Sequence, residues 1–232
     1  DPRLARRAVV VLLVSATAAT LYALARFVHA GGAFPARVRG LVGHPLTYGG
    51  QATLLASVAM ALLARGPSRA WRISAGAFLL LLAPALLGSY TRSAWIATLV
   101  AACVILSRVK ARWIPVLGAA ALAALLLLPA NYRERALSAF DPKSVWNVER
   151  LHLWNAGLRM FRDHPVTGVG LQDLHALYER YRSPDAHERH GHLHNVFVQV
   201  AATMGVVGLA ALAWLLAGLY GTAGHRWRAP LP

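Results

Sequence analysis

Three cationic residues in separate polar segments suggest phosphate chemistry: Arg92, Arg150 and His194. The planar guanidinium group matches two phosphate oxygens at once, so Arg92 and Arg150 could neutralise a diphosphate leaving group. Histidine titrates near neutral pH, which suits His194 to accept the proton of an attacking hydroxyl group. The residue types therefore predict a group transfer from a diphosphate, and we expect no metal ion in the site.

A run of histidines offers a different chemistry, a zinc site. Alternate residues of an extended segment face the same side, and zinc accepts imidazole ligands. The region has no cysteine and no His-x3-His pair on a predicted helix, which favours incidental histidines in a solvated loop. The candidate ligands are His187, His190, His192 and His194.

Two further enzyme classes have only fragments of their motifs. Asp163 and His164 could form an acid–base pair, with Ser183 or Ser144 as the nucleophile, but the Gly-x-Ser-x-Gly turn of hydrolases is missing. The glycine turn at residues 168–170 lacks the preceding strand and third glycine of a dinucleotide-binding motif. We therefore expect no cofactor.

The elements that must position these residues are apolar helices. Of the 232 residues 57% are hydrophobic and 14% are charged, and the mean hydropathy is +0.46, whereas a soluble domain is about one quarter charged. Six apolar runs approach the roughly 17–25 residues that cross a bilayer, the third to fifth being short. They are residues 8–27, 45–64, 73–88, 93–107, 114–129 and 196–220. The sequence predicts an all-α polytopic membrane protein with about six transmembrane helices.

One long polar segment, residues 130–194, lies between the last two apolar runs. Polar backbone and charged groups cost several kcal/mol each in hydrocarbon, so this segment must fold on one face of the membrane. It carries eight of the nine acidic residues and nine Lys or Arg. We expect a helical loop of this length outside the membrane, carrying Arg150 and His194.

The net charge of +15 reflects membrane topology rather than nucleic-acid binding. Eleven basic residues fall near the termini and in alternate connections, and by the positive-inside rule that side is the cytoplasm. They are Arg3, Arg6, Arg7, Arg65, Arg69, Arg72, Arg108, Lys110, Arg112, Arg226 and Arg228. We expect both termini in the cytoplasm, the long loop outside, and no nucleic-acid partner.

Four arginines on the outer side do not follow this pattern: Arg26, Arg37, Arg39 and Arg92. No acidic residue is close to them in sequence. They can snorkel to the head groups of membrane lipids, or they can hold a phosphate. We expect snorkelling for Arg26 and substrate binding for Arg37, Arg39 and Arg92.

The long loop should contain two helices. Asn147 can cap the first, which runs to about Arg162 and ends before Pro165. Trp154 lies on its apolar face, with Arg150 one turn earlier, and we place both among the substrate-binding residues. The second helix is expected at about residues 171–182.

Three motifs, in this order, resemble those of the superfamily of O-antigen ligases and O-antigen polymerases. They are Ser89-Tyr90-Thr91-Arg92-Ser93-Ala94-Trp95; Arg150-x3-Trp154-Asn155-Ala156-Gly157 with Asp163-His164-Pro165-Val166-Thr167-Gly168-Val169-Gly170; and His194-Asn195-x9-Gly205-Val206-Val207-Gly208. The resemblance covers about residues 37–220. Members of this superfamily usually have about ten to twelve spans, and the chain begins with Asp1, so we expect a fragment or processed product that represents the C-terminal part.

The resemblance implies a metal-independent, sugar-inverting glycosyltransferase of the bacterial inner membrane, with its active face in the periplasm. The donor would be a glycan on undecaprenyl diphosphate, and the acceptor the lipid A core or another glycan. By motif, Arg92 and Arg150 bind the diphosphate, His194 activates the acceptor, Gly168 and Gly170 shape the loop, and Asn195 positions substrate or caps a helix.

The organisation that we expect has three parts: five transmembrane helices in residues 1–129, the periplasmic loop in residues 130–194, and a last helix with a cytoplasmic tail in residues 195–232. An O-antigen ligase is the first hypothesis, followed by a polymerase and then a protein O-oligosaccharyltransferase. A transporter or flippase of lipid-linked sugars is the alternative from another class. It would place charges and broken helices at mid-membrane, where this chain has mostly Ala, Leu and Val.

Overall fold

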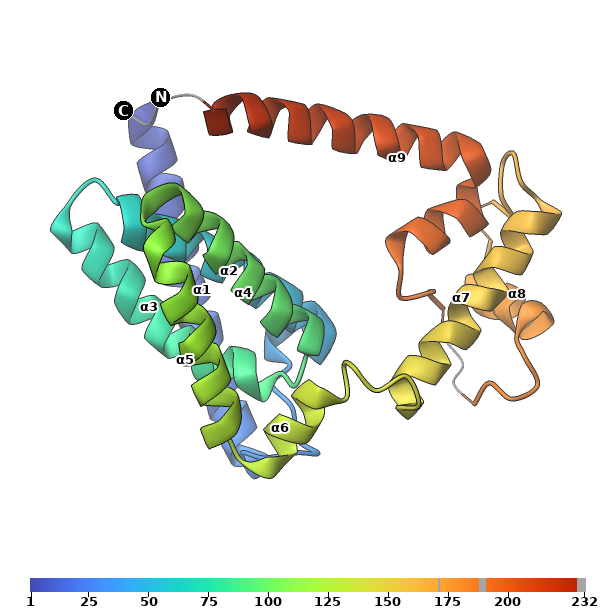
Figure 1. Cartoon of the computed structure of the whole chain (residues 1–232), viewed down its shortest axis with the longest axis horizontal. Helices are drawn as coiled ribbons and strands as arrows, with labels where there is room; N and C mark the ends of the chain where they lie inside the picture. The colour runs from blue at the N-terminus through green and yellow to red at the C-terminus, as the bar shows by residue number, and fades with distance from the viewer. Residues whose placement is uncertain (171, 188–190, 229–232) are drawn as a thin grey trace. The chain divides into compact units, whose positions relative to one another are not determined.

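The computed structural model describes residues 1–170, 172–187 and 191–228. Within these ranges every regular element is a helix, so the predicted all-α class is confirmed there (Figure 1). The chain forms two compact units, Asp1–Ala139 and Phe140–Pro232, which are described one at a time below.

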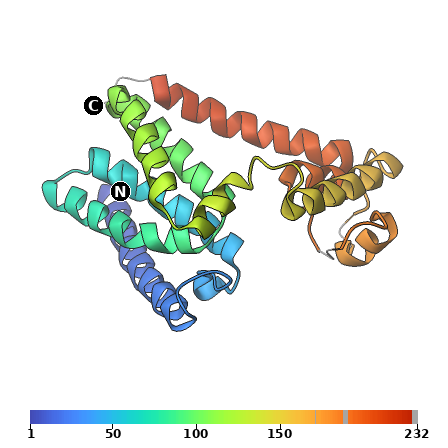
Figure 2. The ribbon, with the colours of Figure 1, turned by 60° about the horizontal axis from the view of Figure 1, so that its bottom comes forward.

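Unit 1 is a bundle of apolar helices. Helix α2 packs against both α3 and α4, and α1 packs against α3 (Figure 2). The helices are α1 (Pro2–His29), α2 (Pro45–Arg65), α3 (Arg69–Gly88), α4 (Arg92–Val109), α5 (Ile114–Leu127) and α6 (Ala130–Leu137), with short 3-10 turns η1 (Gly40–Val42) and η2 (Ala111–Trp113).

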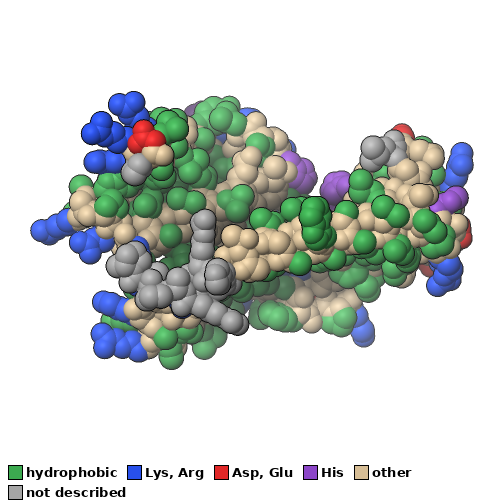
Figure 3. Space-filling view, turned by 90° about the horizontal axis from the view of Figure 1, so that it is seen from above, with side chains coloured by type: hydrophobic (Ala, Val, Ile, Leu, Met, Phe, Trp, Pro, Cys, Tyr) green, Lys and Arg blue, Asp and Glu red, His purple; other side chains and the backbone are tan. Residues whose placement is uncertain are grey.

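Small side chains form much of the core of unit 1. Ala52, Ala56, Ala59, Ala75 and Ala85 are all buried, and small residues of this kind let membrane helices approach closely. Large apolar side chains point outward instead. Figure 3 shows hydrophobic side chains over much of the face in view, with Lys and Arg gathered towards its margins. This distribution fits helices that are surrounded by lipid.

Five described helices are long and apolar enough to cross a membrane: Arg3–His29, Pro45–Arg65, Arg69–Gly88, Arg92–Val109 and Val196–Thr222. They correspond to five of the six predicted spans. The remaining predicted span, residues 114–129, contains the shorter apolar helix α5 of 14 residues.

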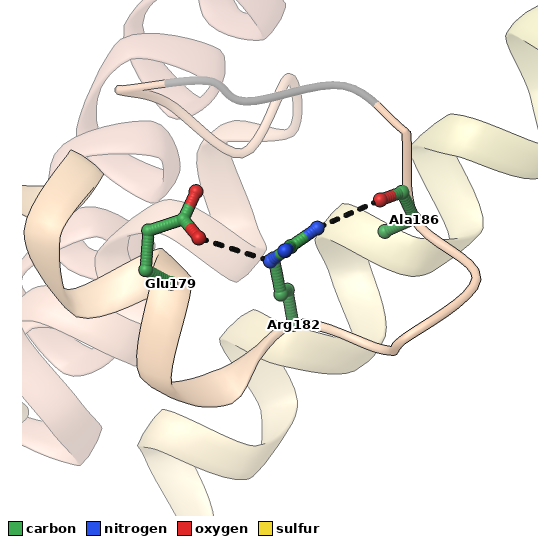
Figure 4. A network of polar contacts seen from close by, with 3 residues as sticks. All are labelled: Glu179, Arg182 and Ala186. Atoms are coloured by element: carbon green, nitrogen blue, oxygen red, sulfur yellow. Dashed lines mark hydrogen bonds and ion pairs between the residues drawn. The ribbon is translucent and has the colours of Figure 1, made fainter.

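Unit 2 contains the long polar loop and the last apolar helix. Helix α7 (Val145–Asp163) packs against α8 (Leu174–Tyr181) and α9 (Val196–Arg228). Leu153, Met160, Tyr178 and Leu193 are buried at its core. Arg182 closes the end of α8, where its Nε lies 3.0 Å from Glu179 and its Nη1 donates to the Ala186 carbonyl at 2.9 Å (Figure 4).

Two predicted helix starts in unit 2 were wrong by a few residues. Ser144, not Asn147, is the N-cap residue of α7, and the Asn147 side chain donates back to the Asp141 carbonyl at 2.7 Å. Asp173 caps α8 by accepting from the His175 amide at 3.0 Å, so α8 starts later than residue 171. His164 ends α7 as predicted, because the following proline disfavours a helical conformation.

Candidate functional site

Arg92 begins α4 directly after a buried turn at residues 89–91. Its side chain is only 7% exposed, and Nη1 donates to the Ser138 hydroxyl at 2.9 Å, just after α6. Ser89 and Thr91 are almost fully buried at 0% and 2% exposed. The turn therefore holds the first residue of α4 in a polar environment at the end of an apolar helix pair.

The turn has an unusual conformation at Tyr90. This residue has a φ of +50°, a left-handed value that is rare for a side chain other than glycine. Its ring stacks on Tyr132 of α6 at 4.5 Å between centroids, and its hydroxyl accepts from Asn131 at 2.8 Å. Burial and the hydrogen bond with Tyr90 raise the pKa of Tyr132 to about 12, so its hydroxyl stays neutral. Aromatic packing and hydrogen bonds thus fix the strained residue that precedes Thr91 and Arg92.

Arg37 contacts this turn from the loop between α1 and α2. Its Nε donates to the Ser89 carbonyl at 2.8 Å, and its Nη2 donates to the Tyr90 carbonyl and the Thr91 hydroxyl, each at 3.3 Å. Burial, and to a lesser extent the charge of Arg39, lower the pKa of Arg37 from its ordinary value. Arg37 was expected to bind substrate, and the structure places one edge of its guanidinium group on the protein backbone.

A pocket of about 300 Å³ brings three of the four outer arginines together. Arg26, Arg37 and Arg39 line it with Phe27 and small residues of α1 and the following loop. The Arg26 guanidinium also lies 5.9 Å from the centre of the Tyr22 ring. Arg26, which we expected to snorkel, therefore shares a pocket with Arg37 and Arg39. Three cations around one pocket form a site suited to phosphate oxygens.

Unit 2 holds Arg150 and Trp154 on α7. Arg150 is half-buried, and none of the described residues forms a hydrogen bond with its side chain. Trp154 packs against the core of unit 2, and its buried indole N–H has no acceptor among the described residues. Arg150 is thus a half-buried residue of α7, whereas Trp154 contributes mainly to packing.

His194 lies at the start of α9 between two anchored neighbours. Leu193 is fully buried, and its amide donates to the Gln199 side chain at 2.9 Å. Asn195 caps α9, because its Oδ1 accepts from the amides of Phe197 and Val198 at 3.0 and 3.3 Å. His194 itself has a φ of +51°, and its ring lies 4.0 Å from that of His192. The backbone on both sides of His194 is therefore held by hydrogen bonds.

Leu193, the residue before His194, packs on the same face of α7 as Arg150. A Cβ atom on Gly157 would approach Leu193 to 2.6 Å, so the segment that carries His194 rests directly on Gly157. Arg150 is seven residues earlier on α7, on the same face and about 10 Å along the helix axis. At the other end of this segment, the His187 amide donates to buried Glu149 at 3.2 Å. In unit 2, therefore, the segment before His194 contacts the face of α7 that carries Arg150, whereas Arg92 and Arg37 belong to unit 1.

Helix α9 is broken at Gly205, and the loop at residues 165–170 fills the break. Gly205 has non-helical backbone angles, and the bend is visible in Figure 1. Four backbone hydrogen bonds of 2.8 to 3.3 Å join the loop to the helix on both sides of the break. They run from the amides of Val169 and Gly170 to the carbonyls of Ala202 and Thr203, and from the amides of Val206 and Val207 to those of Pro165 and Val166.

Gly168 and Gly170 have different roles in this contact. Both have left-handed backbone angles, but only Gly168 is in close contact with another segment. A Cβ atom there would overlap the backbone of Thr203 and Met204, whereas one on Gly170 would meet nothing within 4 Å. Gly168 therefore permits the docking of the loop, and Gly170 supplies a turn conformation.

The candidate zinc ligands form no metal site within the described residues. No group of three or more His, Cys, Asp or Glu side chains there could hold a metal ion; His190, one of the candidate ligands, lies outside the described ranges. Hydrogen bonding to Asp163 raises the pKa of Tyr181, so Asp163 is engaged with a tyrosine.

Part of the predicted cytoplasmic tail lies outside the described part of the chain. This applies to residues 229–232 and to the side chains of Arg226 and Arg228, which entered the topology prediction.

Several residues around the turn could not be identified from the sequence. Asn131, Tyr132, Arg135 and Ser138 all belong to α6 or the residue after it, and each contacts the turn or Arg92. Buried Glu149 is a similar case beside Arg150. The only sequence signal was the position of these polar residues at the start of the long loop, next to an apolar run.

Comparison with protein families shows to which family the chain belongs. The model of the O-antigen ligase family matches residues 77–213, which include Arg92, Arg150, His194 and Gly205. Because this match covers more than half of the 232 residues, the chain belongs to that family, within the superfamily of O-antigen ligases and polymerases. Together with the five candidate spans, it defines a multi-pass membrane protein of a bacterial type. A comparison with curated proteins gave no match.

Proposed function

We propose that this protein is an O-antigen ligase, which transfers a glycan from undecaprenyl diphosphate to a hydroxyl group of the lipid A core in lipopolysaccharide synthesis. Family membership supports a glycosyltransferase-like enzyme that acts on lipid-linked glycans. The observation that carries the proposal is the buried turn that presents Arg92 at the start of α4. Arg37, which binds this turn, also lines the pocket that it shares with Arg26 and Arg39. This arrangement suits a diphosphate at the membrane surface.

In the proposed reaction the arginines bind the leaving group. Arg92 and Arg150 donate to the diphosphate oxygens and stabilise the negative charge that grows as the bond from the anomeric carbon to the phosphate oxygen breaks. Arg39, at the pocket beside the turn, adds positive charge for the second phosphate. The lipid then leaves as undecaprenyl diphosphate, and no metal ion or cofactor takes part.

His194 acts as the general base. It accepts the proton of the acceptor hydroxyl while that oxygen attacks the anomeric carbon from the side opposite the diphosphate, which inverts the configuration. The N-cap at Asn195 and the buried Leu193 hold the imidazole in position, and this preorganisation favours the transition state. The active face is periplasmic in this proposal, because the basic residues of the other connections mark the cytoplasmic side.

A polymerase or a protein O-oligosaccharyltransferase of the same superfamily would use the same donor with another acceptor. The test supplies purified protein in lipid with an undecaprenyl-diphosphate glycan and, in separate reactions, lipid A core, a second lipid-linked glycan or an acceptor protein. We expect transfer to lipid A core. Transfer only to the second lipid-linked glycan would identify a polymerase, and transfer only to protein an oligosaccharyltransferase.

A transporter is the alternative suggested by one structural feature, the break in α9. Broken membrane helices hold substrates in many transporters. Here the backbone of residues 165–170 occupies the break, and the flanking residues Thr203, Met204 and Val206 are uncharged. The break thus joins the loop to the helix, and a glycosyltransferase remains the better proposal. Movement of lipid-linked glycan across vesicles without any transfer would favour the transporter.

A further inference from the structure

We propose that Arg37 is a positioning residue that sets the direction of Arg92 by fixing the turn between α3 and α4. This inference rests on the proposed function, and it replaces the expectation that Arg37 itself binds substrate. The family match begins at residue 77, so Arg37 lies outside the matched region. Its role comes from contacts with residues more than 50 positions away in the sequence.

The hydrogen bonds show how one side chain can hold the whole turn. Arg37 donates from two nitrogen atoms to three consecutive residues, Ser89, Tyr90 and Thr91, at 2.8 to 3.3 Å. A buried carbonyl without a donor is costly, and Arg37 supplies N–H donors to the Ser89 and Tyr90 carbonyls of the buried turn. The three donors of a lysine ammonium radiate from one nitrogen, so they cannot reproduce the fixed spacing of the Nε and Nη2 donors that reach Ser89, Tyr90 and Thr91.

The turn needs such a support because Tyr90 is strained. The left-handed φ of +50° is unfavourable for a residue with a Cβ atom, and surrounding contacts must over-determine it. Two guanidinium groups meet on the Tyr90 carbonyl, Arg37 at 3.3 Å and Arg135 at 3.2 Å. Thr91 is then fixed from the other side by its hydroxyl, which donates to the Pro45 carbonyl at 3.1 Å.

Arg92 follows this turn without any intervening residue. Thr91 is the N-cap position of α4 and Arg92 is its first residue. A change at Tyr90 or Thr91 therefore moves the point from which the Arg92 side chain extends. Misplacement of a catalytic group by about 1 Å can lower the rate about 10²-fold. By holding the turn, Arg37 therefore also keeps Arg92 in place for the proposed phosphate contact.

A double-mutant cycle tests whether Arg37 acts through Arg92. Glycan transfer is measured for Arg37→Lys, Arg92→Lys and the double variant, with Arg37→Lys/Arg150→Lys as the reference pair. We expect Arg37→Lys to lower kcat about 10- to 100-fold. The double variant with Arg92→Lys should lose no more than Arg92→Lys alone, whereas the losses with Arg150→Lys should multiply. Losses that multiply in both pairs would overturn the inference and make Arg37 an independent substrate ligand.

Hydrogen exchange gives a readout that does not need enzymatic activity. Amides in the peptide at residues 86–95 should exchange faster in Arg37→Lys than in the parent protein, and should be unchanged in Arg39→Lys, whose side chain is exposed. Equal exchange in the parent and Arg37→Lys would overturn the positioning role. If the parent transfers no glycan at all, the proposed function fails, but the exchange comparison still decides whether Arg37 holds the turn. If Arg37→Lys does not fold, Thr91→Val removes one of its acceptors and enters the same cycle.

Discussion

The backbones of Gly168 and Gly205 lie in direct contact, so that a Cβ atom added to Gly205 would come within 2.7 Å of the Gly168 amide nitrogen. Both residues have positive φ values, +67° and +62°. The two motifs that contain them are separated by more than 30 residues, and they meet through main-chain atoms. This contact joins the loop after α7 to the broken helix α9.

Alanine substitutions should separate two contributions of these glycines to stability, the close packing of the backbone and the left-handed backbone conformation. Gly168→Ala and Gly205→Ala should each destabilise unit 2 by more than about 3 kcal/mol, because their Cβ atoms would overlap main-chain atoms that cannot move aside. Gly170→Ala should cost only about 1–2 kcal/mol, since a side chain there meets strain but no neighbour. Thermal unfolding in detergent measures the difference. Equal losses at all three positions would contradict the close packing.

Lysine substitutions test the two diphosphate-binding arginines. Arg92→Lys and Arg150→Lys should each lower glycan transfer roughly 10²-fold and weaken donor binding, because a point charge cannot replace a bidentate contact. Arg133→Lys in α6 and Arg162→Lys in α7 are matched controls, since both side chains are exposed. The measurement is transfer by purified protein at equal folded concentrations. Full activity in both Arg92→Lys and Arg150→Lys would remove the proposed phosphate contacts.

His194→Ala should lower turnover by about 10²–10⁴-fold if this residue is the general base. The effect should fall on kcat, with donor affinity largely retained, because the base acts on the acceptor hydroxyl. His175→Ala is the control, since His175 is an exposed histidine of α8 in the same unit. An unchanged kcat in His194→Ala would assign proton transfer to another group, and loss of activity with chelators would point to a metal ion.

Asn195 can be tested as a helix cap. Asn195→Ala should destabilise the protein by about 1 kcal/mol, because two amides of α9 lose their acceptor, whereas Asn195→Ser should keep the cap. We therefore expect near-parental stability and transfer in Asn195→Ser. A folded and stable Asn195→Ser with little activity would instead assign the amide group to substrate binding.

Membrane topology can be tested with single cysteines at Ser68 and Asp185. Both positions are exposed, and the natural Cys103 is replaced by alanine. An impermeant thiol reagent applied to intact cells should label the cysteine at position 185 and leave the one at 68 unlabelled until the cells are opened. The reverse pattern would place the long loop in the cytoplasm and contradict a periplasmic reaction.

The sequence predicted most of the helices, because hydrophobic runs and prolines are local signals, but it missed α6 (Ala130–Leu137) in the long loop. The spans and the end of α7 before Pro165 followed directly from them. Contacts distant in sequence were beyond this reasoning: nothing local to Arg37 indicates that it would bind the carbonyls of Ser89 and Tyr90. The break at Gly205 was missed for a related reason. It lies within an apolar run, and only the docked loop supplies the hydrogen bonds that compensate for the interrupted helix.

The main-chain character of the contact between the loop and α9 leaves its outer side chains free to vary. In this contact the amides of Val206 and Val207 donate hydrogen bonds, and the carbonyl of Val166 accepts one. The side chains of Val166, Val206 and Val207 are nevertheless 63%, 54% and 61% exposed. A library that replaces these three valines with other apolar residues should therefore retain folded protein. The rim can thus be redesigned with apolar side chains of other shapes while Gly168 and Gly205 hold the main-chain contact.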